Sequence, residues 1–448
     1  MGSNLTRRQL LGTMGTTGAL ALAGCAVGDD EESSASLTIG VLQDFSGPLP
    51  AYGAQGTAGF YNGLAQKADD DPLPSDAVDA GEYEYSVGDT DIELLVRDTQ
   101  FNPQEAQSLA EDLTTEDEVD LLFGVGNSGG AQRVITQVVD RSDVPFIMGP
   151  AASAGLTAND ETCREQVFRA NENTAMDARS GGVYIAESTD VDKMALFGAD
   201  DTFGQSVINN YRTVLENRGV DIVLERSVAS GQQEWEGLLE DAENEGAQGM
   251  VGGFTASTLP FFATEFLTGD YDLQLFGGFA SRVTLGIVGD TLSDVLGDNF
   301  TNEGIANANF GPFTTRYHWN QYDNEINDAF IDRHTSTYDV VPDLFTSGAF
   351  TAASAVVQAV EEEGEGSRDA IVSGLRGMTV EETPKGEGGY TFQEYNNQAQ
   401  SQMTVANVEV TPEDQGNWPA AIQPGEPVET VAAEDVTIPA SEMSCDLS

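Results

Sequence analysis

Short apolar runs alternate with longer segments of helical periodicity from residue 37 onward. The predicted strands of the first part are 37–43, 91–98, 119–124 and 144–150, and the predicted helices are 56–68, 103–116 and 131–140. Strands that alternate with helices of this length are typical of a parallel sheet covered by helices on both faces. We therefore expect a first α/β unit here, interrupted by an acidic, turn-rich insertion at 69–90.

The same alternation restarts after residue 174. Its predicted helices are 175–188, 203–219, 235–246 and 258–269, and its predicted strands are 192–198, 220–228, 247–253 and 272–278. Two α/β sheets of similar size predict two lobes, which agrees with a length of 448 residues. Further predicted helices are 325–338, 346–363 and 367–377, followed by predicted strands at 388–393 and 400–410. The acidic, proline-rich segment 411–448 is expected to be a loosely packed tail.

Acidic residues are spread over the whole chain. The sequence has 75 Asp and Glu against 19 Lys and Arg, which gives a formal net charge of −56. Such a charge repels nucleic acid and anionic membranes, so we exclude both as partners. Because the charge is dispersed, we expect a surface that stays soluble at high salt, where the Debye length falls to ~3 Å at 1 M. We therefore predict a halophilic protein of haloarchaeal origin, with an unusually acidic mesophilic protein as the alternative.

Residues 1–24 have the features of an export signal. Arg7 and Arg8 precede an apolar, glycine-rich run that ends in the letters LAGC. This arrangement resembles a twin-arginine signal followed by a lipobox, with Cys25 as the lipid-modified first residue of the mature protein. Residues 25–36 are small and acidic, and we expect them to form a flexible tether. The interpretation places the protein outside the cell, anchored to the outer face of the cytoplasmic membrane.

Two further cysteines, Cys163 and Cys445, follow this signal. Outside the cell, an even pair more often forms a disulfide than a metal site. One such bridge would hold the C-terminal tail against the body of the protein, and two reduced thiols are the alternative.

The sequence contains no recognisable catalytic or metal-binding constellation. Its two histidines, His318 and His334, lack metal-ligand spacing to a cysteine or to each other. We expect His318 to pack among neighbouring aromatic residues and His334 to lie on the surface of an acidic helix. The segment 124–129 fits the pattern G-x-G-x-x-G, but the next predicted strand ends without the acidic residue that a dinucleotide requires. We therefore predict neither an enzyme nor a bound cofactor or metal.

Two turns after neighbouring predicted strands are better suited to bind a small anion. The turn 126–130 has the sequence GNSGG and leads into a predicted helix, and the turn 150–155 has the sequence PAASAG. Backbone N–H groups and a hydroxyl at the amino end of a helix favour negative charge. Ligands of open α/β sheets bind at this carboxyl edge of the strands. The two turns are predicted to bind one carboxylate, with ordinary tight turns as the alternative.

Several motifs together resemble those of the solute-binding proteins of branched-chain amino-acid ABC importers. They are IGVLQDFSGPLPAYG at 39–53, VRDTQFNPQEA at 96–106, FGVGNSGGAQ at 123–132, PFIMGPAASAGLT at 145–157, VFRANEN at 167–173 and LFGADDTFGQSV at 196–207. The resemblance covers residues 37–410 and implies the type I periplasmic-binding fold, an α/β fold with two Rossmann-like lobes and parallel sheets joined by three hinge crossovers. It also implies a small-molecule ligand between the lobes and an ABC permease as partner.

The resemblance further implies a set of ligand-binding residues. Position by position, these are Tyr52, Ser128, Ala151, Ser153, Phe203, Phe254 and Phe279. Ser128 stands where the family has the hydroxyl that binds the ligand carboxylate, and Phe279 stands where amino-acid-binding members have the acid that pairs with the α-ammonium. A buried ammonium without a counter-charge is costly, so Phe279 favours an apolar or aromatic carboxylate, or a small amide, over a zwitterion. Asp200 or Asp201 could instead supply the charge, which leaves amino acids open.

The same resemblance divides the chain into lobes. Lobe I is expected at 37–171 and 311–384, lobe II at 172–310 and 385–410, and the crossovers near 171–174, 307–312 and 380–386. The predicted function is that of an extracytoplasmic, monomeric substrate-binding lipoprotein of an ABC importer. A ligand sensor of the same fold that signals to a membrane partner is the alternative.

Overall fold

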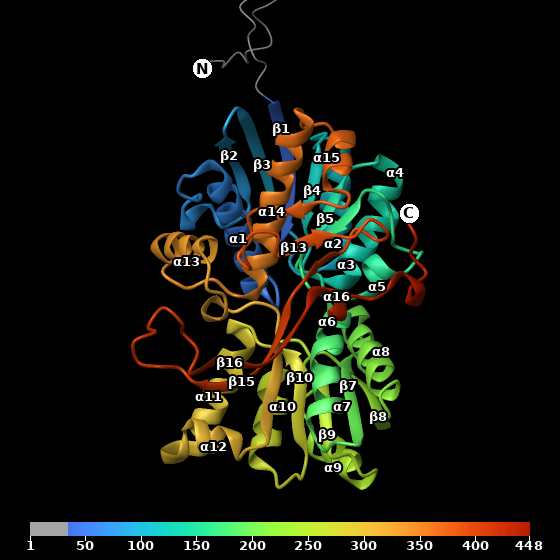
Figure 1. Ribbon diagram of the computed structural model, residues 1–448, viewed down its shortest axis with the longest axis vertical. Helices are drawn as coiled ribbons and strands as arrows, with labels where there is room; N and C mark the ends of the chain where they lie inside the picture. The colour runs from blue at the N-terminus through green and yellow to red at the C-terminus, as the bar shows by residue number, and fades with distance from the viewer. Residues whose placement is uncertain (1–34) are drawn as a thin grey trace, which may run out of the picture. The chain divides into compact units, whose positions relative to one another are not determined.

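The computed structural model describes residues 35–448, without the side chains of Ala35 and Phe279, and each of its two lobes is built on its own sheet (Figure 1). The predicted export signal, its twin arginines and Cys25 lie outside the described residues. Within the described residues, no helix has the length and apolar character needed to cross a membrane.

The first lobe contains a six-stranded sheet in the order β2-β3-β1-β4-β5-β6. Its strands are β1 Ala35–Gln43, β2 Gly81–Val87, β3 Thr90–Asp98, β4 Leu121–Gly124, β5 Phe146–Met148 and β6 Val167–Arg169. All neighbours are parallel except β2, which pairs antiparallel with β3. The insertion at 69–90 therefore contains an edge strand that was not predicted, because exposed glutamates alternate with its half-buried tyrosines.

Helices cover both faces of this sheet. Alternating side chains of β1 point to opposite faces, so Ile39 and Val41 pack toward α1 (Pro50–Ala68) and α14 (Leu344–Glu363). Leu42 instead packs toward the face covered by α2 (Pro103–Thr115) and α3 (Ser128–Val134). The close approach of α1 and α14 requires glycine, because a Cβ at Gly59 would lie 2.4 Å from the carbonyl oxygen of Thr346.

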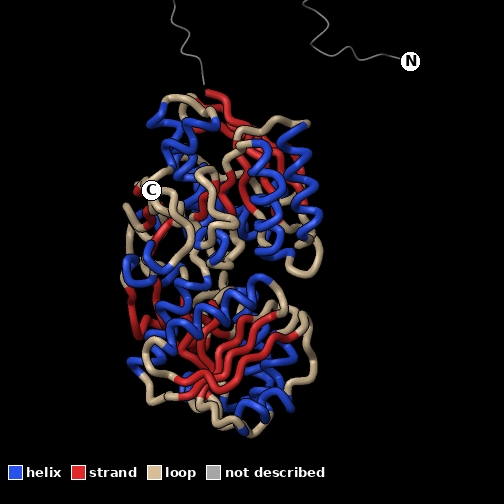
Figure 2. The backbone as a smooth tube through the Cα atoms, turned by 90° about the vertical axis from the view of Figure 1, so that its right-hand side faces the viewer, coloured by secondary structure: helices blue, strands red, loops and turns tan. Residues whose placement is uncertain are grey.

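The second lobe contains a seven-stranded sheet in the order β16-β15-β11-β10-β9-β7-β8. Its strands are β7 Lys193–Ala199, β8 Asp221–Val228, β9 Gly249–Gly253, β10 Gln274–Phe279, β11 Phe310–Thr315, β15 Met403–Val410 and β16 Ile422–Val431. Strands β7 to β11 run parallel, and β15 and β16 are antiparallel additions at one edge. Figure 2 shows these strands between helices.

The helices of the second lobe form two apolar layers with its sheet. One face packs against α7 (Val183–Ser188) and α8 (Thr202–Glu216). The other face packs against α9 (Glu236–Asn244), α10 (Leu259–Thr268) and α11 (Arg282–Leu296). The helix α11 was not predicted, although Ser281 forms a capping box with Thr284 at its start.

A third, small sheet extends the first lobe. It contains β12 Thr379–Val380, β13 Tyr390–Phe392 and β14 Ala399–Ser401. Tyr390 and Phe392 belong to the apolar core of the first lobe, where the rings of Phe392 and Phe168 lie 5.7 Å apart. The segment 385–401 was therefore wrongly assigned to lobe II, because its apolar side chains fill the core of the first lobe.

Two of the predicted crossovers are also wrong. Strand β11 continues to Thr315 in the second sheet, so the chain leaves this lobe after Thr315 and not at 307–312. The chain then returns between β14 and β15, at Ser401–Met403, and not at 380–386. Gly311 and Pro312 concealed β11, because these residue types usually interrupt a strand.

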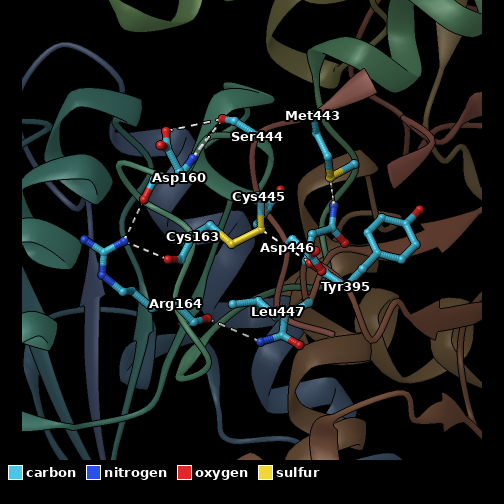
Figure 3. The surroundings of a disulfide bond; sticks show 12 residues. Asp160, Cys163, Arg164, Tyr395, Met443, Ser444, Cys445, Asp446 and Leu447 are labelled. Atoms are coloured by element: carbon cyan, nitrogen blue, oxygen red, sulfur yellow. Dashed lines mark hydrogen bonds between the residues drawn. A yellow bond between two sulfur atoms is a disulfide. The ribbon is translucent and has the colours of Figure 1, made fainter. Parts of the chain in front are cut away.

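The segment 411–448 is packed, which contradicts the predicted loose tail. Its strand β16 pairs antiparallel with β15 across seven positions, and Ile422 and Val436 are fully buried. Cys163 and Cys445 form a disulfide with a Cα–Cα distance of 5.7 Å (Figure 3). The prolines and glutamates of this segment are compatible with an edge strand, whose outer side faces solvent.

His334 is buried, which contradicts the predicted surface position. It lies on α13 (Glu325–Tyr338) with 2% of its side chain exposed, and its Nδ1 lies 3.2 Å from Asn62 Nδ2 on α1. Burial lowers the pKa of His334 to about 3, so the ring is neutral. The acidic residues of α13 lie on the opposite, solvent-facing side of the helix. They led to the wrong prediction that His334 also lies on the surface. His318 is also buried, with its ring edge-to-face against Trp418 at 4.7 Å.

Candidate functional site

A cavity of about 190 Å³ lies between the two lobes at the carboxyl ends of their strands. We call this cavity the cleft. The first lobe contributes Tyr52, Phe101, Pro103, Gly126, Asn127, Ser128, Gly129, Pro150, Ala152 and Phe345, and the second contributes Asp201, Thr202, Phe203, Phe254 and Thr255. Four of the predicted ligand-binding residues therefore line one cavity: Tyr52, Ser128, Phe203 and Phe254.

The first turn, 126–130, connects β4 to α3 and forms one end of the cleft. Asn127 caps the helix, because its side-chain oxygen accepts the N–H of Gly130 at 3.0 Å. The helix therefore begins at Ser128, three residues before the predicted start. Gly126 must be a glycine, because a Cβ there would lie 2.3 Å from Asp44 Oδ2.

Asp44 supports this turn from behind and was not predicted. It lies at the end of β1, fully buried, and its Oδ1 accepts the hydroxyl of Thr99 and, at 2.8 Å, the N–H of Phe101. Burial raises the pKa of Asp44 to about 6, against the opposing effect of these hydrogen bonds. Asp44 thus joins the loop that carries Phe101 to the turn that carries Ser128.

The second turn, 150–155, lies beside the first. Ser153 donates its N–H to Ser128 Oγ at 3.2 Å, so the two predicted turns are in direct contact. Ala152 lines the cleft, whereas Ala151 and Ser153 direct their carbonyl groups to the buried side chain of Arg169. The N–H of Ala151 is also occupied, because it donates to the carbonyl of Val125 at 3.2 Å.

Aromatic rings form the long walls of the cleft. Tyr52 packs against Phe345 with ring centroids 4.4 Å apart and against Phe101 at 6.4 Å. Phe203 and Phe254 face them from the second lobe. Phe101 and Phe345 escaped the sequence analysis because their segments are 244 positions apart and only the fold brings them together. The cleft is therefore suited to hold a flat or branched apolar group.

The second lobe offers one carboxylate to the cleft. Among the described residues that line it, Asp201 is the only charged one. Its Oδ1 accepts the N–H of Gly204 at 2.8 Å and so caps α8. Asp200 is exposed and does not line the cleft. Phe279 is the last residue of β10, and its side chain is not among those described.

The two lobes are in contact around the cleft. Ser206 on α8 accepts the N–H of Ala154 at 3.0 Å, and Asp343 before α14 accepts the N–H of Arg282 at 2.7 Å. An apolar cluster also joins the lobes, and its members are Leu49, Tyr52, Phe101, Ala256, Val283, Ile287, Leu344 and Phe345. These contacts define a closed arrangement.

Buried ion pairs lie where the chain crosses between the lobes. Lys385 donates to Glu172 Oε1 at 2.7 Å, and the same oxygen accepts hydrogen bonds from Tyr390 and Ser401. Burial alone would raise the pKa of Glu172, but the charge of Lys385 and these hydrogen bonds hold it below its usual value. Sequence analysis missed the pair because its members lie 213 positions apart.

A second cavity of about 80 Å³ lies inside the second lobe, behind the cleft. Phe203 and Phe254 line both cavities, so these two residues lie between them. The inner cavity is otherwise lined mainly by apolar residues of β9 to β11, α10 and α11.

Comparison with known proteins identifies the family that has this architecture. The model of a periplasmic binding protein family matches residues 36–417. The Leu/Ile/Val-binding protein homolog 7 of Brucella abortus (strain 2308) is 23% identical over 392 residues, covering 83% of this chain and 88% of the relative.

Two solved structures show the same fold. An ABC-type branched-chain amino acid transporter from Rhodopseudomonas palustris CGA009 has a TM-score of 0.67 at 20% identity, covering 90% of this chain and 99% of the other. A solute-binding protein of an ABC transporter from R. palustris, in complex with 4-hydroxybenzoate, has a TM-score of 0.68 at 16% identity, covering 89% and 97%. The predicted two-lobed α/β fold, the periplasmic-binding type I fold, is thereby confirmed.

Members of this family bind small molecules and work with an ABC permease. The position of the cleft between the lobes agrees with that role. The chain belongs to the periplasmic binding protein family and is a substrate-binding protein of the ABC-transporter type.

Proposed function

We propose that this protein captures a small carboxylate with an aromatic or branched apolar body and delivers it to an ABC importer. The observation that carries the proposal is the composition of the cleft: five aromatic residues line it together with Ser128 and the backbone at the amino end of α3. The rings would bury the apolar body, and the donors of the turn at Ser128 would bind the carboxylate.

The relatives suggest two forms of such a ligand. The Brucella relative is named for Leu, Ile and Val, and the R. palustris structure holds 4-hydroxybenzoate. Asp201 is the available partner for an α-ammonium, but one of its oxygens already caps α8. An aromatic carboxylate leaves no ammonium to be paired, so we favour it over an amino acid.

Isothermal titration at high salt tests this proposal with benzoate, 4-hydroxybenzoate, leucine and benzamide. We expect both benzoates to bind more tightly than leucine, and benzamide to bind more weakly than benzoate. Tighter binding of leucine would contradict the preference for aromatic acids, and binding of none of the three acids would contradict the function. Mass spectrometry of the recovered ligand should show it unchanged, because the proposed role is binding without turnover.

We further propose that the protein is exported by the twin-arginine route, anchored by lipid at Cys25 and active as a monomer. The sequence at Arg7, Arg8 and Cys25 supports the route and the anchor. A Cys25→Ser variant should appear in the culture medium instead of the membrane fraction, and replacing both arginines by lysine should retain the precursor inside the cell. Membrane retention of Cys25→Ser would rule out the lipid anchor.

A further inference from the structure

Arg169 is a buried cation that lies directly behind the second turn. It is the last residue of β6, and no part of its side chain is exposed. Its Nη1 donates to the carbonyl oxygens of Ser153 at 2.7 Å and Ala151 at 3.2 Å, Nη2 donates to Thr157 Oγ1 at 2.8 Å, and Nε donates to Gln398 Oε1 at 2.6 Å.

All four acceptors of Arg169 are neutral. Among residues 35–448, the other buried cations Arg316 and Lys385 each have a carboxylate partner, whereas Arg169 forms no ion pair. Burial, with a smaller effect of Arg316, lowers the pKa of Arg169 to about 9, so the guanidinium remains charged at neutral pH. A buried charge without a counter-charge is costly, and its field is weakly screened in the interior.

The field of Arg169 reaches the cleft through the peptide groups of the second turn. In a trans peptide the N–H points opposite to the C=O, so the N–H of Ala152 points away from the guanidinium that binds the carbonyl of Ala151. Ala152 is the residue of this turn that lines the cleft together with Pro150. The other carbonyl that Arg169 binds, that of Ser153, belongs to the peptide whose N–H donates from Ala154 to Ser206 of the second lobe.

The first turn is connected to the same network. Ser128 Oγ accepts the N–H of Ser153, so the hydroxyl proton of Ser128 is left to donate elsewhere. Ser128 lines the cleft, and its proton can therefore be donated to a ligand there. The peptide that carries this N–H has its carbonyl on Ala152, which accepts the N–H of Thr174, so Ser128 is joined to the second turn and not to the guanidinium itself.

We propose that Arg169 is the positioning and specificity residue that makes the cleft selective for an anion. Its guanidinium binds two carbonyl groups of the second turn. From behind this turn, one peptide layer away from the ligand, it supplies the positive potential that a ligand carboxylate neutralises. This inference rests on the proposed carboxylate ligand. It assigns the anion preference to a residue that does not touch the ligand.

A charge placed beside Arg169 tests the inference without removing the arginine. Thr157→Asp would give the guanidinium a counter-charge at the position of Thr157 Oγ1, and Thr157→Asn is the matched neutral control. The readout is the ratio of the dissociation constants of benzamide and benzoate, measured by isothermal titration at high salt. We expect Thr157→Asp to lower this ratio by about tenfold and Thr157→Asn to leave it within about threefold of the wild type.

Direct replacement of the arginine provides a second arm. Arg169→Met should lose the preference for benzoate, and Arg169→Lys should keep most of it, provided that near-UV circular dichroism shows a folded protein. Arg226→Gln, which removes an exposed cation of the second lobe, is the control. At high salt it should leave the ratio of the dissociation constants unchanged, because exposed charges are screened.

The outcomes separate this inference from the proposed function. If the ratio of the dissociation constants is the same in Thr157→Asp, Thr157→Asn and the wild type, the role of Arg169 is overturned. The proposed function stays intact in that case as long as the wild type binds benzoate. If the wild type binds benzamide as tightly as benzoate, both the anion preference and the role of Arg169 are overturned.

Discussion

Ser128 and Arg169 act on the second turn from opposite sides. The N–H of Ser153 binds Ser128 Oγ, and the carbonyl of the same residue binds the guanidinium of Arg169. The turn is thus held at Ser153 through both the N–H and the carbonyl of this residue, which keeps its donors in place before a ligand arrives. Such preorganisation reduces the free-energy cost of ordering a binding site.

Ser128→Ala should weaken binding of a carboxylate by about 1–3 kcal/mol, because the carboxylate loses a donor and the N–H of Ser153 loses its acceptor. Isothermal titration with benzoate at high salt measures the loss. Ser142→Ala, at the end of the same helical segment and outside the cleft, is the control. An unchanged affinity in Ser128→Ala would remove this hydroxyl from the site.

Phe254→Ala should change which ligand is preferred, because it truncates a residue that lies between the cleft and the inner cavity of the second lobe. Benzoate should lose affinity together with the ring contact, whereas 4-propylbenzoate should gain relative to benzoate. Val295→Ala, an exposed apolar residue on α11, is the control. If the ratio of the two dissociation constants does not change, the cavities are not joined at this residue.

At the scale of elements, the hinge is held by charges that only the fold brings together. Glu172 lies in the first crossover, and Lys385 lies in the loop between β12 and β13. The ammonium also donates to Ser401 at 3.0 Å and to the carbonyl of Gln402 at 2.6 Å, next to the third crossover. One buried lysine thus connects two of the segments that join the lobes.

Lys385→Met should lower the free energy of unfolding by about 3–5 kcal/mol at neutral pH, because it leaves Glu172 charged and buried without a counter-charge. The lowered pKa of Glu172 means that the ion pair stabilises the protein above the unfolded pKa and that this stabilisation is lost as pH falls through the folded pKa. The difference in unfolding free energy between the variant and the wild type should therefore become smaller as the pH is lowered. Denaturant unfolding at a series of pH values measures it.

The double variant Glu172→Gln with Lys385→Met is the matched control, because it removes both charges. Its unfolding free energy should lie closer to that of the wild type than the value of Lys385→Met alone. A single variant as stable as the wild type at neutral pH would show that the pair contributes nothing.

Apolar runs predicted most of the buried strands, although the buried strands β6 and β11 were missed. Strands such as β1 and β4 are rich in apolar residues, and their alternation with helices along the chain predicts the parallel sheet. The edge strands β2 and β16 were missed because exposed glutamates interrupt their apolar residues, namely Glu82 and Glu84 in β2 and Glu426 and Glu429 in β16. Tyr52, Ser128, Phe203 and Phe254 came from collinear motifs, whereas Phe101, Phe345 and Arg169 depend on contacts between distant segments.

At the scale of the whole molecule, charge and the C-terminal segment determine stability. The segment 422–448 runs from β16 in the second lobe to the disulfide at Cys163 in the first, so it connects the lobes in addition to the crossovers. The net charge of −56 acts against any compact state in dilute buffer, because the acidic residues repel one another.

Lowering the salt concentration should therefore destabilise the protein. We expect the midpoint of thermal unfolding to fall steadily as the salt is reduced from about 2 M to about 0.1 M, where the Debye length grows to ~10 Å. Circular dichroism at a series of potassium chloride concentrations follows the transition. A midpoint that is independent of salt would contradict a halophilic surface.

Native mass spectrometry of protein purified from its own host, without added ligand, tests the central claim most directly. The closed arrangement of the lobes predicts that a ligand is retained, and the cleft predicts that this ligand is a small carboxylate with an aromatic or branched apolar body. Its release on denaturation would allow identification by mass and fragmentation. A retained cation, or a neutral molecule without a carboxylate, would contradict the account.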